Sequence, residues 1–506
     1  MVKSQQRLLI VLLATFVLKL LVAAYLPMTG DEAYFITWGK YLDYGFYDHP
    51  PMVGWFLSAM LAVSDSALWL RLPQILITSF IGWGIYQLLR RQHEDVAMMA
   101  AVLYLLAPIN ILGVLITTDT PLLLWSFISA WCFYAAQRHD SMKWYFAAGL
   151  FLGLAFLSKY FAALLGVAYA LYLLFLVRRG GRPWLGLVWV IVGTLPFIAL
   201  NLWWNYNHCW NNILFNLFNR TSGDKFNLFT IFEYLLTVLY LVTPPIVYYL
   251  IRDARSFARQ LVSDRFNVFM ALVLIPYGLF LLLSFWVTIG LHWLLSFYPF
   301  VFIAIATVFS AQQLRRSFYF MLPFSILHLL VFAFLVVFSP GLFKNNESHY
   351  KDVVYSMYAE QIVAKLSAYQ PRFELATDSY VESALLSYAG RQHIMVFGQG
   401  SYHARQDDAI TDFRALQGKN ILVLSYKSKQ QEYAKYFERV EVLPLAMAET
   451  HYSMLLGYGF KYPVYRDKVL KQVMQRYYHI PAFLPLGACY MRDKYGEKNS
   501  AGQARD

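Results

Sequence analysis

The pattern of apolar and polar positions along the chain is dominated by long apolar runs joined by short polar links. The first run extends from Leu8 to Leu26. Several later runs are shorter than the ~20 residues that a helix needs to cross a bilayer, so their ends must extend into the flanking links. In a bilayer these segments must be helical, because a lone strand leaves backbone groups unsatisfied. The later runs are Pro73–Leu89, Val96–Ile116, Pro121–Ala136, Trp144–Leu157, Phe161–Val177, Trp184–Trp203, Ile231–Ile251, Val268–Val287, Trp293–Phe309 and Phe318–Phe338.

The first apolar run has two interpretations. Lys3 and Arg7 precede it, as in a cleaved signal peptide. The run is longer than a usual signal core and further spans follow it. We therefore predict an uncleaved first membrane helix.

The charges of the links predict the orientation of the spans. Cytoplasmic loops carry an excess of Lys and Arg. Basic residues follow every even-numbered run, while acidic residues gather after odd-numbered ones. This alternation predicts about eleven spans with the even-numbered exits in the cytoplasm. The basic exits hold Arg90 and Arg91; Arg138 and Lys143; Arg178, Arg179 and Arg182; Arg252, Arg255, Arg259 and Arg265; and Arg315 and Arg316, whereas the outer links hold Asp31, Glu32, Asp43, Asp48, Asp119, Lys159 and Asp224.

The character of the chain changes after Phe338, where charges become frequent and no full span follows. We predict a transmembrane domain over residues 1–339, with a catalytic first outer loop at 27–72, and an extracytoplasmic α/β domain over 340–506. The fold class is thus mostly α with a small α/β domain. We see no nucleotide fingerprint, Cys/His metal pattern or internal repeat. The expected elements are a helix at Tyr350–Tyr369 and strands at Phe373–Thr377, His393–Phe397, Asn420–Leu424 and Val440–Leu443.

Composition agrees with a membrane protein. Hydrophobic residues make up 59% of the 506 positions and charged residues 14%, and aromatic residues, which favour membrane interfaces, reach 18%. The formal charge of +12 lies in short loops, which indicates positive-inside bias rather than nucleic-acid binding. Cys132 is expected to be a packed core residue. Cys209 and Cys489 either pair or stay apart, since the sequence fixes no distance between them.

The first outer loop is the densest group of candidate functional residues. Asp31 and Glu32 directly follow the first span. A carboxylate at a membrane edge can simply meet water as a solvated helix end. Adjacent acids beside an apolar span, in a loop with few Lys, also fit a functional site. Both interpretations remain open on position alone.

A second cluster reads Tyr47-Asp48-His49-Pro50-Pro51. The two prolines limit the backbone and would hold the acid and the imidazole in place. The alternative is a simple turn before an interfacial helix. Two ligands without a visible third do not make a metal site, so none is predicted.

Four residues at outer span ends complete the candidates. Arg71 is disfavoured at the outer face, so it asks for an anionic partner or snorkels to headgroups. Asp119 fits a catalytic acid or a helix start before Pro121. Lys159 fits a phosphate contact or a headgroup contact. His292 fits substrate binding or ordinary packing.

Together these groups predict a type of chemistry. A carboxylate can accept a proton from a hydroxyl or amine nucleophile. A cation can stabilise a phosphate leaving group. Both demands meet in transfer of a group from a lipid-linked phosphate at the outer leaflet.

At this point the motifs resemble a known family, the polyprenyl-phosphate-sugar-dependent membrane glycosyltransferases of the C class. The nearest subgroups are the bacterial aminoarabinose transferases acting on lipid A and the protein O-mannosyltransferases. The similarity covers about the first 300 residues. Its landmarks, in order, are GDEAYF, YDHPPMVGW, LRLPQ, TDTP, LSKY and HWLLSFYP.

The resemblance implies roles for individual residues. Asp31 matches the catalytic acid of the first outer loop, which deprotonates or orients the acceptor. Glu32 matches the paired acid after it, and Asp119 the second-loop acid. Arg71 resembles the arginine that contacts the donor phosphate, with Lys159 beside it in that role.

The same motif shows a departure from the family. His49 stands where aminoarabinose transferases commonly have Lys before the Pro-Pro pair, and Asp48 stands where they have an acid. The change puts a permanent cation at this position in doubt and points to a different sugar. We keep His49 with the donor-phosphate group, and Tyr47, Asp48 and His292 as candidate substrate contacts.

The implied reaction is displacement at the anomeric carbon with inversion, in which polyprenyl phosphate leaves. The expected partners are a polyprenyl-phosphate sugar, a lipid or glycan acceptor and membrane lipids, without nucleic acid. No cofactor is expected, although the family includes metal-dependent members. The expected location is a bacterial inner membrane, with the site and the C-terminal domain extracytoplasmic. Lipid A or another envelope glycan is the first choice of acceptor.

Two other functions remain open. A protein O-glycosyltransferase would use the same donor with a secreted protein as acceptor. A lipid or solute transporter would place its charged residues near the membrane midplane rather than at the outer span ends.

Overall fold

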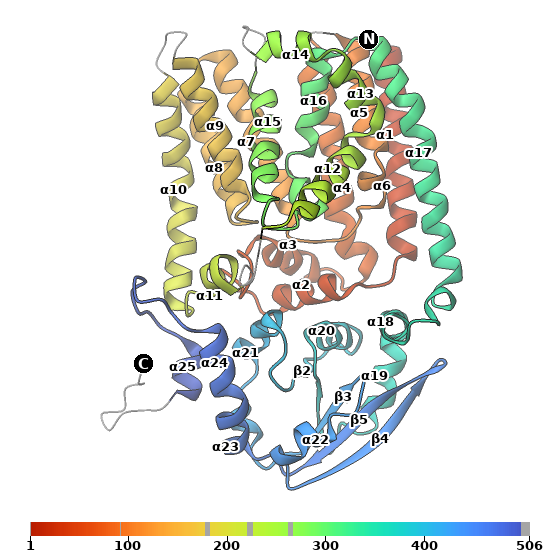
Figure 1. The fold of residues 1–506 in the computed structure, drawn as a ribbon, viewed down its shortest axis with the longest axis vertical. Coiled ribbons are helices and arrows are strands. Elements are labelled where there is room, and N and C mark those ends of the chain that lie inside the picture. The colour runs from red at the N-terminus through yellow and green to blue at the C-terminus, as the bar shows by residue number, and fades with distance from the viewer. Residues whose placement is uncertain (1, 92, 178–182, 220–225, 262–266, 497–506) are drawn as a thin grey trace. The chain divides into compact units, whose positions relative to one another are not determined.

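The computed structural model describes residues 2–91, 93–177, 183–219, 226–261 and 267–496 (Figure 1). The packing of the chain divides it into two compact units. We call Met1–Leu26, Val63–Ala199 and Gly223–Val336 the helical unit, and Pro27–Ala62, Leu200–Ser222 and Val337–Asp506 the mixed unit. Residues 27–62 and 200–222 group with the C-terminal residues. The predicted domain boundary at residue 340 stays a prediction.

The helical unit is built from apolar helices, many of them packed side by side along their length. Helix α1 packs on α4 and α5, α7 on α8, α9 on α15, and α16 on α5 and α15. Its elements are α1 (Val2–Tyr25), α4 (Ala67–Leu89), α5 (Glu94–Leu106), α6 (Pro108–Leu112), α7 (Asp119–His139), α8 (Met142–Phe156), α9 (Ala162–Val177), α10 (Pro183–Asn207, whose residues from Leu200 on belong to the mixed unit), α12 (Leu228–Val242), α13 (Pro244–Arg252), α14 (Ala254–Leu261), α15 (Val268–Leu283), α16 (Tyr298–Val308) and α17 (Ala311–Phe338).

Membrane-spanning helices are present, although the predicted number is not confirmed. Within the described residues, four helices are long and apolar enough to cross a bilayer: Ser4–Tyr25, Ala67–Leu89, Trp184–Asn207 and Ala311–Phe338. A fifth span results if α12 and α13 are counted as one, although they meet at 100°. Most of the other predicted spans correspond to shorter apolar helices, whereas the run Pro121–Ala136 lies within α7, which has 21 residues. The protein is therefore a multi-pass membrane protein.

Prolines explain why two predicted spans are interrupted. The run Val96–Ile116 divides at Ala107, where Pro108 begins a new helix. The run Ile231–Ile251 divides at Thr243, before Pro244 and Pro245. Proline disfavours helical geometry in the residue before it and lacks the N–H that would continue the helix. Hydropathy alone did not reveal these breaks.

Close helix packing relies on small residues. Gly149 of α8 faces the backbone of α10, and a Cβ there would lie 2.1 Å from the carbonyl oxygen of Val190. Thr194 of α10 donates to the carbonyl of Gly149 at 3.0 Å. Gly149 thus lets the backbones of α8 and α10 come close together, and the hydroxyl of Thr194 joins the two helices by a hydrogen bond. On α17, by contrast, large apolar side chains such as Leu330 and Phe334 are exposed, as expected of a lipid-facing surface.

The mixed unit contains a five-stranded sheet with strand order β2-β1-β3-β5-β4 (Figure 1). Strands β2, β1 and β3 are parallel, whereas β5 runs antiparallel to both β3 and β4. Helix α20 packs against α2 and α19. The small α/β domain is thus confirmed. The strands are β1 (Glu374–Thr377), β2 (Met395–Val396), β3 (Ile421–Ser425), β4 (Arg439–Met447) and β5 (Thr450–Tyr458), and the main helices are α2 (Gly30–Lys40), α3 (Met52–Leu61), α11 (Asn211–Leu214), α18 (Glu347–Met357), α19 (Ala359–Ser367), α20 (Tyr380–Ala389), α24 (Lys471–Tyr477) and α25 (Tyr490–Tyr495).

Four of these strands were predicted and β5 was not. Residues Met454 to Gly457 of β5 are buried in succession, so its sequence lacks the alternation of a strand with one wet face. The β4–β5 hairpin pairs Met447 with Thr450. Its two-residue turn places Ala448 at φ 50°, in the left-handed region.

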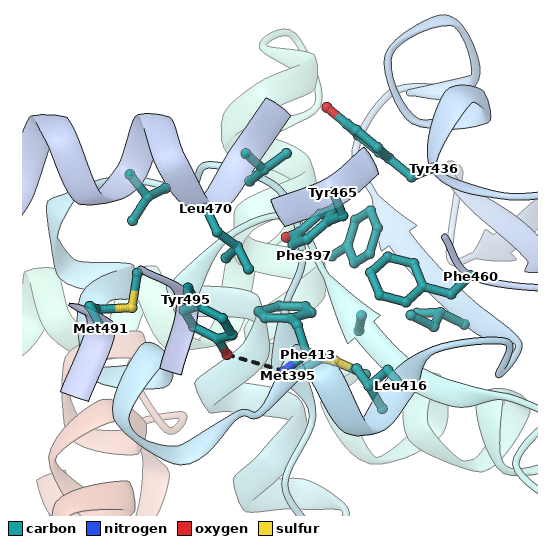
Figure 2. Close-up of a cluster of buried hydrophobic side chains, with 14 of the residues drawn as sticks. Met395, Phe397, Phe413, Leu416, Tyr436, Phe460, Tyr465, Leu470, Met491 and Tyr495 are labelled. Atoms are coloured by element: carbon teal, nitrogen blue, oxygen red, sulfur yellow. Dashed lines mark hydrogen bonds between the residues drawn. The ribbon is translucent and has the colours of Figure 1, made fainter. Parts of the chain in front are cut away.

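The core of the mixed unit is strongly aromatic (Figure 2). The ring of Phe397 packs on that of Tyr465 with centroids 4.8 Å apart, and Phe413 packs on the same ring at 4.7 Å. The backbone N–H of Phe413 donates to the hydroxyl of Tyr495 at 3.1 Å, the dashed line in Figure 2. These contacts fix the C-terminal helices against the sheet.

A disulfide joins Cys209 to Cys489, across 280 residues of sequence. The backbone N–H of Cys209 also donates to the carbonyl of Ala488, and the indole of Trp210 donates to that of Pro485. The alternative that the sequence left open is therefore decided in favour of pairing. Segment 200–222 is thus held to the C-terminal residues covalently and by hydrogen bonds. Of the loop charges used for orientation, Arg178, Arg179, Arg182, Asp224 and Arg265 lie outside the described residues.

Candidate active site

The first outer loop begins with a capping box. Thr29 precedes α2, and its hydroxyl accepts a hydrogen bond from the backbone N–H of Glu32 at 3.3 Å. The Glu32 carboxylate accepts in return from the backbone N–H of Thr29 at 3.3 Å. The reciprocal bonds satisfy N–H groups that a helix start leaves free. Glu32 is therefore buried in a structural role, and its predicted part in catalysis stays a prediction.

Asp31 lies next to the capping box, but it differs from Glu32 in its exposure and in its hydrogen bonding. Its side chain is exposed, and it makes no hydrogen bond or ion pair with any residue that the structure describes. Although the side chain reaches solvent, the surrounding protein partly desolvates its carboxyl and so raises its pKa; His403 and His49 oppose this rise, whereas Asp48 and Glu32 add to it. A carboxylate with free lone pairs and a raised pKa is a stronger proton acceptor than an ordinary aspartate.

Asp48 is the buried carboxylate of the same loop, with its side chain 1% exposed. His403 Nδ1 lies 2.7 Å from its Oδ2, and His49 Nδ1 lies 3.4 Å from its Oδ1. Burial alone would raise the pKa of Asp48, but the two histidines outweigh burial and hold its pKa well below the usual range. Asp48 is therefore an ionised carboxylate between two imidazoles.

Neighbouring backbone and amide groups fix this loop. The backbone N–H of Tyr47 donates to Gln406 Oε1 at 2.8 Å, and its ring is buried in the aromatic core. Asn216 Nδ2 donates to the carbonyl of Asp48 at 3.1 Å. The N–H of Phe46 donates to the carbonyl of His49 at 3.0 Å, which closes a turn before Pro50. Tyr47 thus anchors the loop, and substrate contact by its side chain stays a prediction.

Arg71 belongs to the helical unit and is fully buried. Its Nη1 donates to the carbonyls of Ala23 and Leu26, each at 2.7 Å. These carbonyls lie at the C-terminal end of α1, where a cation complements the helix dipole. The structure therefore gives Arg71 a capping role, and its contact with a donor phosphate stays a prediction.

The structure brings together two other predicted residues of the helical unit. Lys159 Nζ lies 2.9 Å and 3.0 Å from the two carboxylate oxygens of Asp119. Both side chains are buried. Asp119 is the first residue of α7, where a negative charge is favourable. Lys159 was expected to contact the donor phosphate and Asp119 to act as a catalytic acid. In the structure their two charges neutralise each other.

Two further features of the helical unit bear on substrates. His292 lies in a short 3₁₀ helix, Leu291–Leu294, and is exposed. An apolar cavity of about 380 Å³ is lined by residues of α12, α13, α15 and α16, including Leu235, Val273 and Ile305. Among the residues that the structure describes, no group of three or more His, Cys, Asp or Glu side chains is placed to hold a metal ion. The expectation that no cofactor is needed stays a prediction.

Sequence reasoning missed His403. It contacts Asp48 across 355 positions of sequence, from the domain whose role we could not predict. No local motif marks Tyr402-His403, and the only hint was the unexplained acid–imidazole pair Asp48-His49. Only the fold reveals the third member of that group.

Comparisons with known proteins agree with this fold and these motifs. A family model described as dolichyl-phosphate-mannose-protein mannosyltransferase matches residues 48–204. The curated lipid A galacturonosyltransferase of Rhizobium johnstonii is 31% identical over 185 residues, which are 35% of this chain and only 38% of that relative.

Two solved structures of ArnT from Cupriavidus metallidurans also match. The apo structure has a TM-score of 0.60 at 16% identity, over 90% of this chain and 98% of the other. The structure bound to undecaprenyl phosphate has a TM-score of 0.60 at 15% identity, over 88% and 97%. At these identities the match establishes the fold.

The resemblance to the C-class membrane glycosyltransferases is confirmed. The family match begins at Asp48 and ends at Trp204. It therefore includes Asp48 and His49 of YDHPPMVGW as well as LRLPQ, TDTP and LSKY. Asp31 and Glu32 precede it, so their C-class roles rest on the motif alone and stay predictions.

Proposed function

We propose that the protein is a membrane glycosyltransferase that moves a sugar from a polyprenyl-phosphate carrier to lipid A or a related envelope glycan. The relative from Rhizobium johnstonii is a lipid A galacturonosyltransferase, and one matching ArnT structure is bound to undecaprenyl phosphate. Both support the donor and acceptor classes. We place the reaction at the outer face of a bacterial inner membrane.

The observation that carries the proposal is the state of Asp31. It reaches solvent, it has no hydrogen-bond partner among the described residues, and partial desolvation by the surrounding protein raises its pKa. In the proposed step, Asp31 accepts the proton of the acceptor hydroxyl while the oxygen attacks the anomeric carbon. The bond to the phosphate oxygen breaks on the opposite face, and its electron pair leaves with polyprenyl phosphate. The result is inversion at the anomeric carbon.

The donor needs a cationic group for its phosphate and an apolar surface for its chain. We propose Arg71, Lys159 and His49 for the phosphate, as the motifs imply, with Glu32 and Asp119 completing the set of carboxylates. Lys159 would have to exchange its pairing with Asp119 for the phosphate. The apolar cavity between α12 and α16 suits an isoprenoid chain, because its lining is almost entirely hydrocarbon. The scheme needs no metal or other cofactor.

Mass spectrometry of envelope lipids tests the proposal in cells. Membranes from cells with and without the protein are compared, with an Asp31→Asn strain as the third sample. We expect one sugar-bearing lipid A species that only the unaltered protein produces. Identical lipid and glycan profiles in all three samples would exclude this acceptor class.

A second acceptor is favoured by one observation, because the matching family model is described as a protein mannosyltransferase. The same donor chemistry would then glycosylate a Ser or Thr hydroxyl of a secreted protein. Glycopeptide analysis of the same three samples separates the two acceptors. Glycopeptides that depend on the protein, with unchanged lipid A, would replace the first acceptor by the second.

A further inference from the structure

Three contacts join one short segment of the C-terminal domain to the first outer loop. The segment is the 3₁₀ helix Tyr402–Gln406. Besides the bond from His403 to Asp48, the hydroxyl of Tyr34 donates to the carbonyl of His403 at 3.0 Å, and Gln406 accepts from the N–H of Tyr47. All of these residues belong to the mixed unit. The segment is thus fixed at several points rather than resting loosely on the loop.

The ring of His403 has one nitrogen held and one free. Nδ1 donates to the buried carboxylate of Asp48, so a neutral ring carries its lone pair on Nε2. Nε2 makes no hydrogen bond with any residue that the structure describes, and 28% of the side chain is exposed. A buried carboxylate behind an imidazole orients the ring and stabilises its protonated form.

Aromatic rings enclose the imidazole. The rings of Tyr402, Tyr380 and Phe215 lie with their centroids 4.5, 5.0 and 5.5 Å from it. A cavity of about 20 Å³, enough for a single water, is lined by His403 together with Tyr34 and Tyr380. The ring therefore has a fixed orientation and a small opening beside it.

We infer that His403, held by Asp48, receives the proton that Asp31 takes from the acceptor hydroxyl and so returns Asp31 to its ionised form. The inference rests on the proposed function and deepens it. His403 acts through Asp31 and does not itself touch the sugar. In this role, His403 is a residue of the C-terminal domain that takes part in the reaction.

The proton balance of the cycle is simple. The acceptor O–H bond breaks, its electron pair forms the new bond to the anomeric carbon, and its proton goes to Asp31. The proton then passes to Nε2 of His403, which becomes an imidazolium paired with the ionised Asp48. Release of this proton to water restores the starting state. No oxidant, reductant or metal is involved.

The ionisable groups around His403 are consistent with this transfer. Asp48 contacts it from the loop, Asp31 and Tyr34 interact with it from α2, Tyr380 packs on it from α20, and Tyr402 packs on it from its own segment. His49 and Glu32 are the next charged neighbours, of Asp48 and Asp31 respectively. Among the ionisable neighbours of Asp31, His403 opposes the burial-driven rise of its pKa most. The tyrosines stay neutral, since burial raises the pKa of both Tyr380 and Tyr34 above the ordinary value of a tyrosine.

The test uses the full-length protein in detergent, with undecaprenyl-phosphate galacturonic acid as donor and lipid A as acceptor. His403→Asn keeps an amide N–H that can donate to Asp48 but cannot accept a proton. We expect kcat to fall about 100-fold with an unchanged donor KM and an unchanged thermal midpoint. A limb of the wild-type pH–rate profile that depends on the imidazole should be absent from the variant.

A matched control lies nearby. His393 Nε2 forms a similar pair with Asp407 at 3.0 Å, and it is part-buried in the same unit. His393→Asn should leave kcat and the pH profile unchanged. A His403→Ala variant supplies the second measurement, because added imidazoles should restore turnover in proportion to their basicity if the ring carries a proton. Rescue that is equal for all imidazoles would indicate a filled cavity and would overturn the inference.

Two failures are distinguishable. If the wild-type protein transfers no sugar from this donor or from undecaprenyl-phosphate aminoarabinose, the proposed function fails. If the wild type transfers and His403→Asn matches it in kcat and pH profile, only the role of His403 fails. If His403→Asn is less stable and His403→Ala is not rescued, the residue is structural and the inference is wrong.

Discussion

The polar groups of the helical unit and those of the mixed unit differ in how far their bonding capacity is used. In the helical unit, Arg71 donates to two helix-end carbonyls, and Asp119 and Lys159 neutralise each other. In the mixed unit, Asp31 has no partner among the described residues, and the ring of His403 has one free nitrogen. Buried charges whose hydrogen bonds are all made stabilise a structure, whereas a group that reacts with a substrate needs a lone pair or N–H that is still free to bond. The comparison favours Asp31 over Asp119 as the carboxylate that acts.

The largest expected effect is that of Asp31→Asn. The amide cannot accept a proton, so we expect turnover to fall about 10²–10⁴-fold. The thermal midpoint should not change, because the side chain is exposed and unpartnered in the described residues. Asp43→Asn is the matched control, since Asp43 is a carboxylate of the same loop that pairs with His208 at 3.5 Å. Equal turnover of the two variants in a transfer assay would remove Asp31 from the chemistry.

The pH dependence of the transfer rate also tests whether Asp31 accepts the proton. Because the pKa of Asp31 is raised, its ionised and active form appears at higher pH than for an ordinary aspartate. The rate should therefore fall on acidification at a pH above the usual aspartate range of about 3.5–4. Asp43→Asn should leave this limb where it is. A limb at the ordinary aspartate value would show that the carboxyl is not desolvated.

Much of the fold follows from the sequence, because hydrophobic runs and basic loops report directly on a bilayer. The breaks before Pro108 and Pro244 were missed because hydropathy does not report the backbone geometry that proline imposes. Strand β5 was missed because its continuous burial depends on packing. The site was predictable in part. Asp31, Asp48 and His49 belong to one local motif, whereas the contact of Asp48 with His403 depends on a long-range fold. The pairing of Asp119 with Lys159 was likewise invisible, because the two were assigned to different outer links.

Removing Lys159 from its buried pair with Asp119 tests whether the polar groups of the helical unit stabilise the structure. Lys159→Met leaves Asp119 buried without its cation, and we expect a loss of about 3–5 kcal/mol of stability. Adding Asp119→Asn removes the stranded charge and should recover much of that loss. Thermal unfolding in detergent measures both. If the folded double variant also lacks transfer activity, Asp119 or Lys159 takes part in the reaction, as the motifs imply.

Removing the disulfide should lower the stability of the protein by less than breaking the buried ion pair does. Replacing Cys209 and Cys489 by Ser opens the link between segment 200–222 and the C-terminal residues, and we expect a loss of about 2–4 kcal/mol. Peptide mapping without reductant should find the two cysteines joined in the wild type. Free thiols at both positions in protein from an oxidising compartment would contradict the pairing.

The smallest expected effect concerns the capping box. Thr29→Ala removes the hydroxyl at the start of α2 and should cost about 1 kcal/mol. Thr29→Ser keeps the acceptor and should behave as the wild type. Because Asp31 is the second residue of the same helix, fraying of the helix start should displace it slightly, and turnover of Thr29→Ala should fall by only a few-fold. A loss as large as that of Asp31→Asn would mean that the cap itself positions the reaction.

In the proposed reaction, the Asp31 carboxylate at the start of α2, which has no partner among the described residues, drives transfer from a polyprenyl-phosphate donor. Single-turnover release of polyprenyl phosphate from a preformed donor complex, on addition of lipid A, tests it without interference from donor binding. We predict that the wild type releases the carrier together with an equal amount of glycosylated lipid A, and that Asp31→Asn holds the donor but releases none. Release by the variant at the wild-type rate would contradict the account.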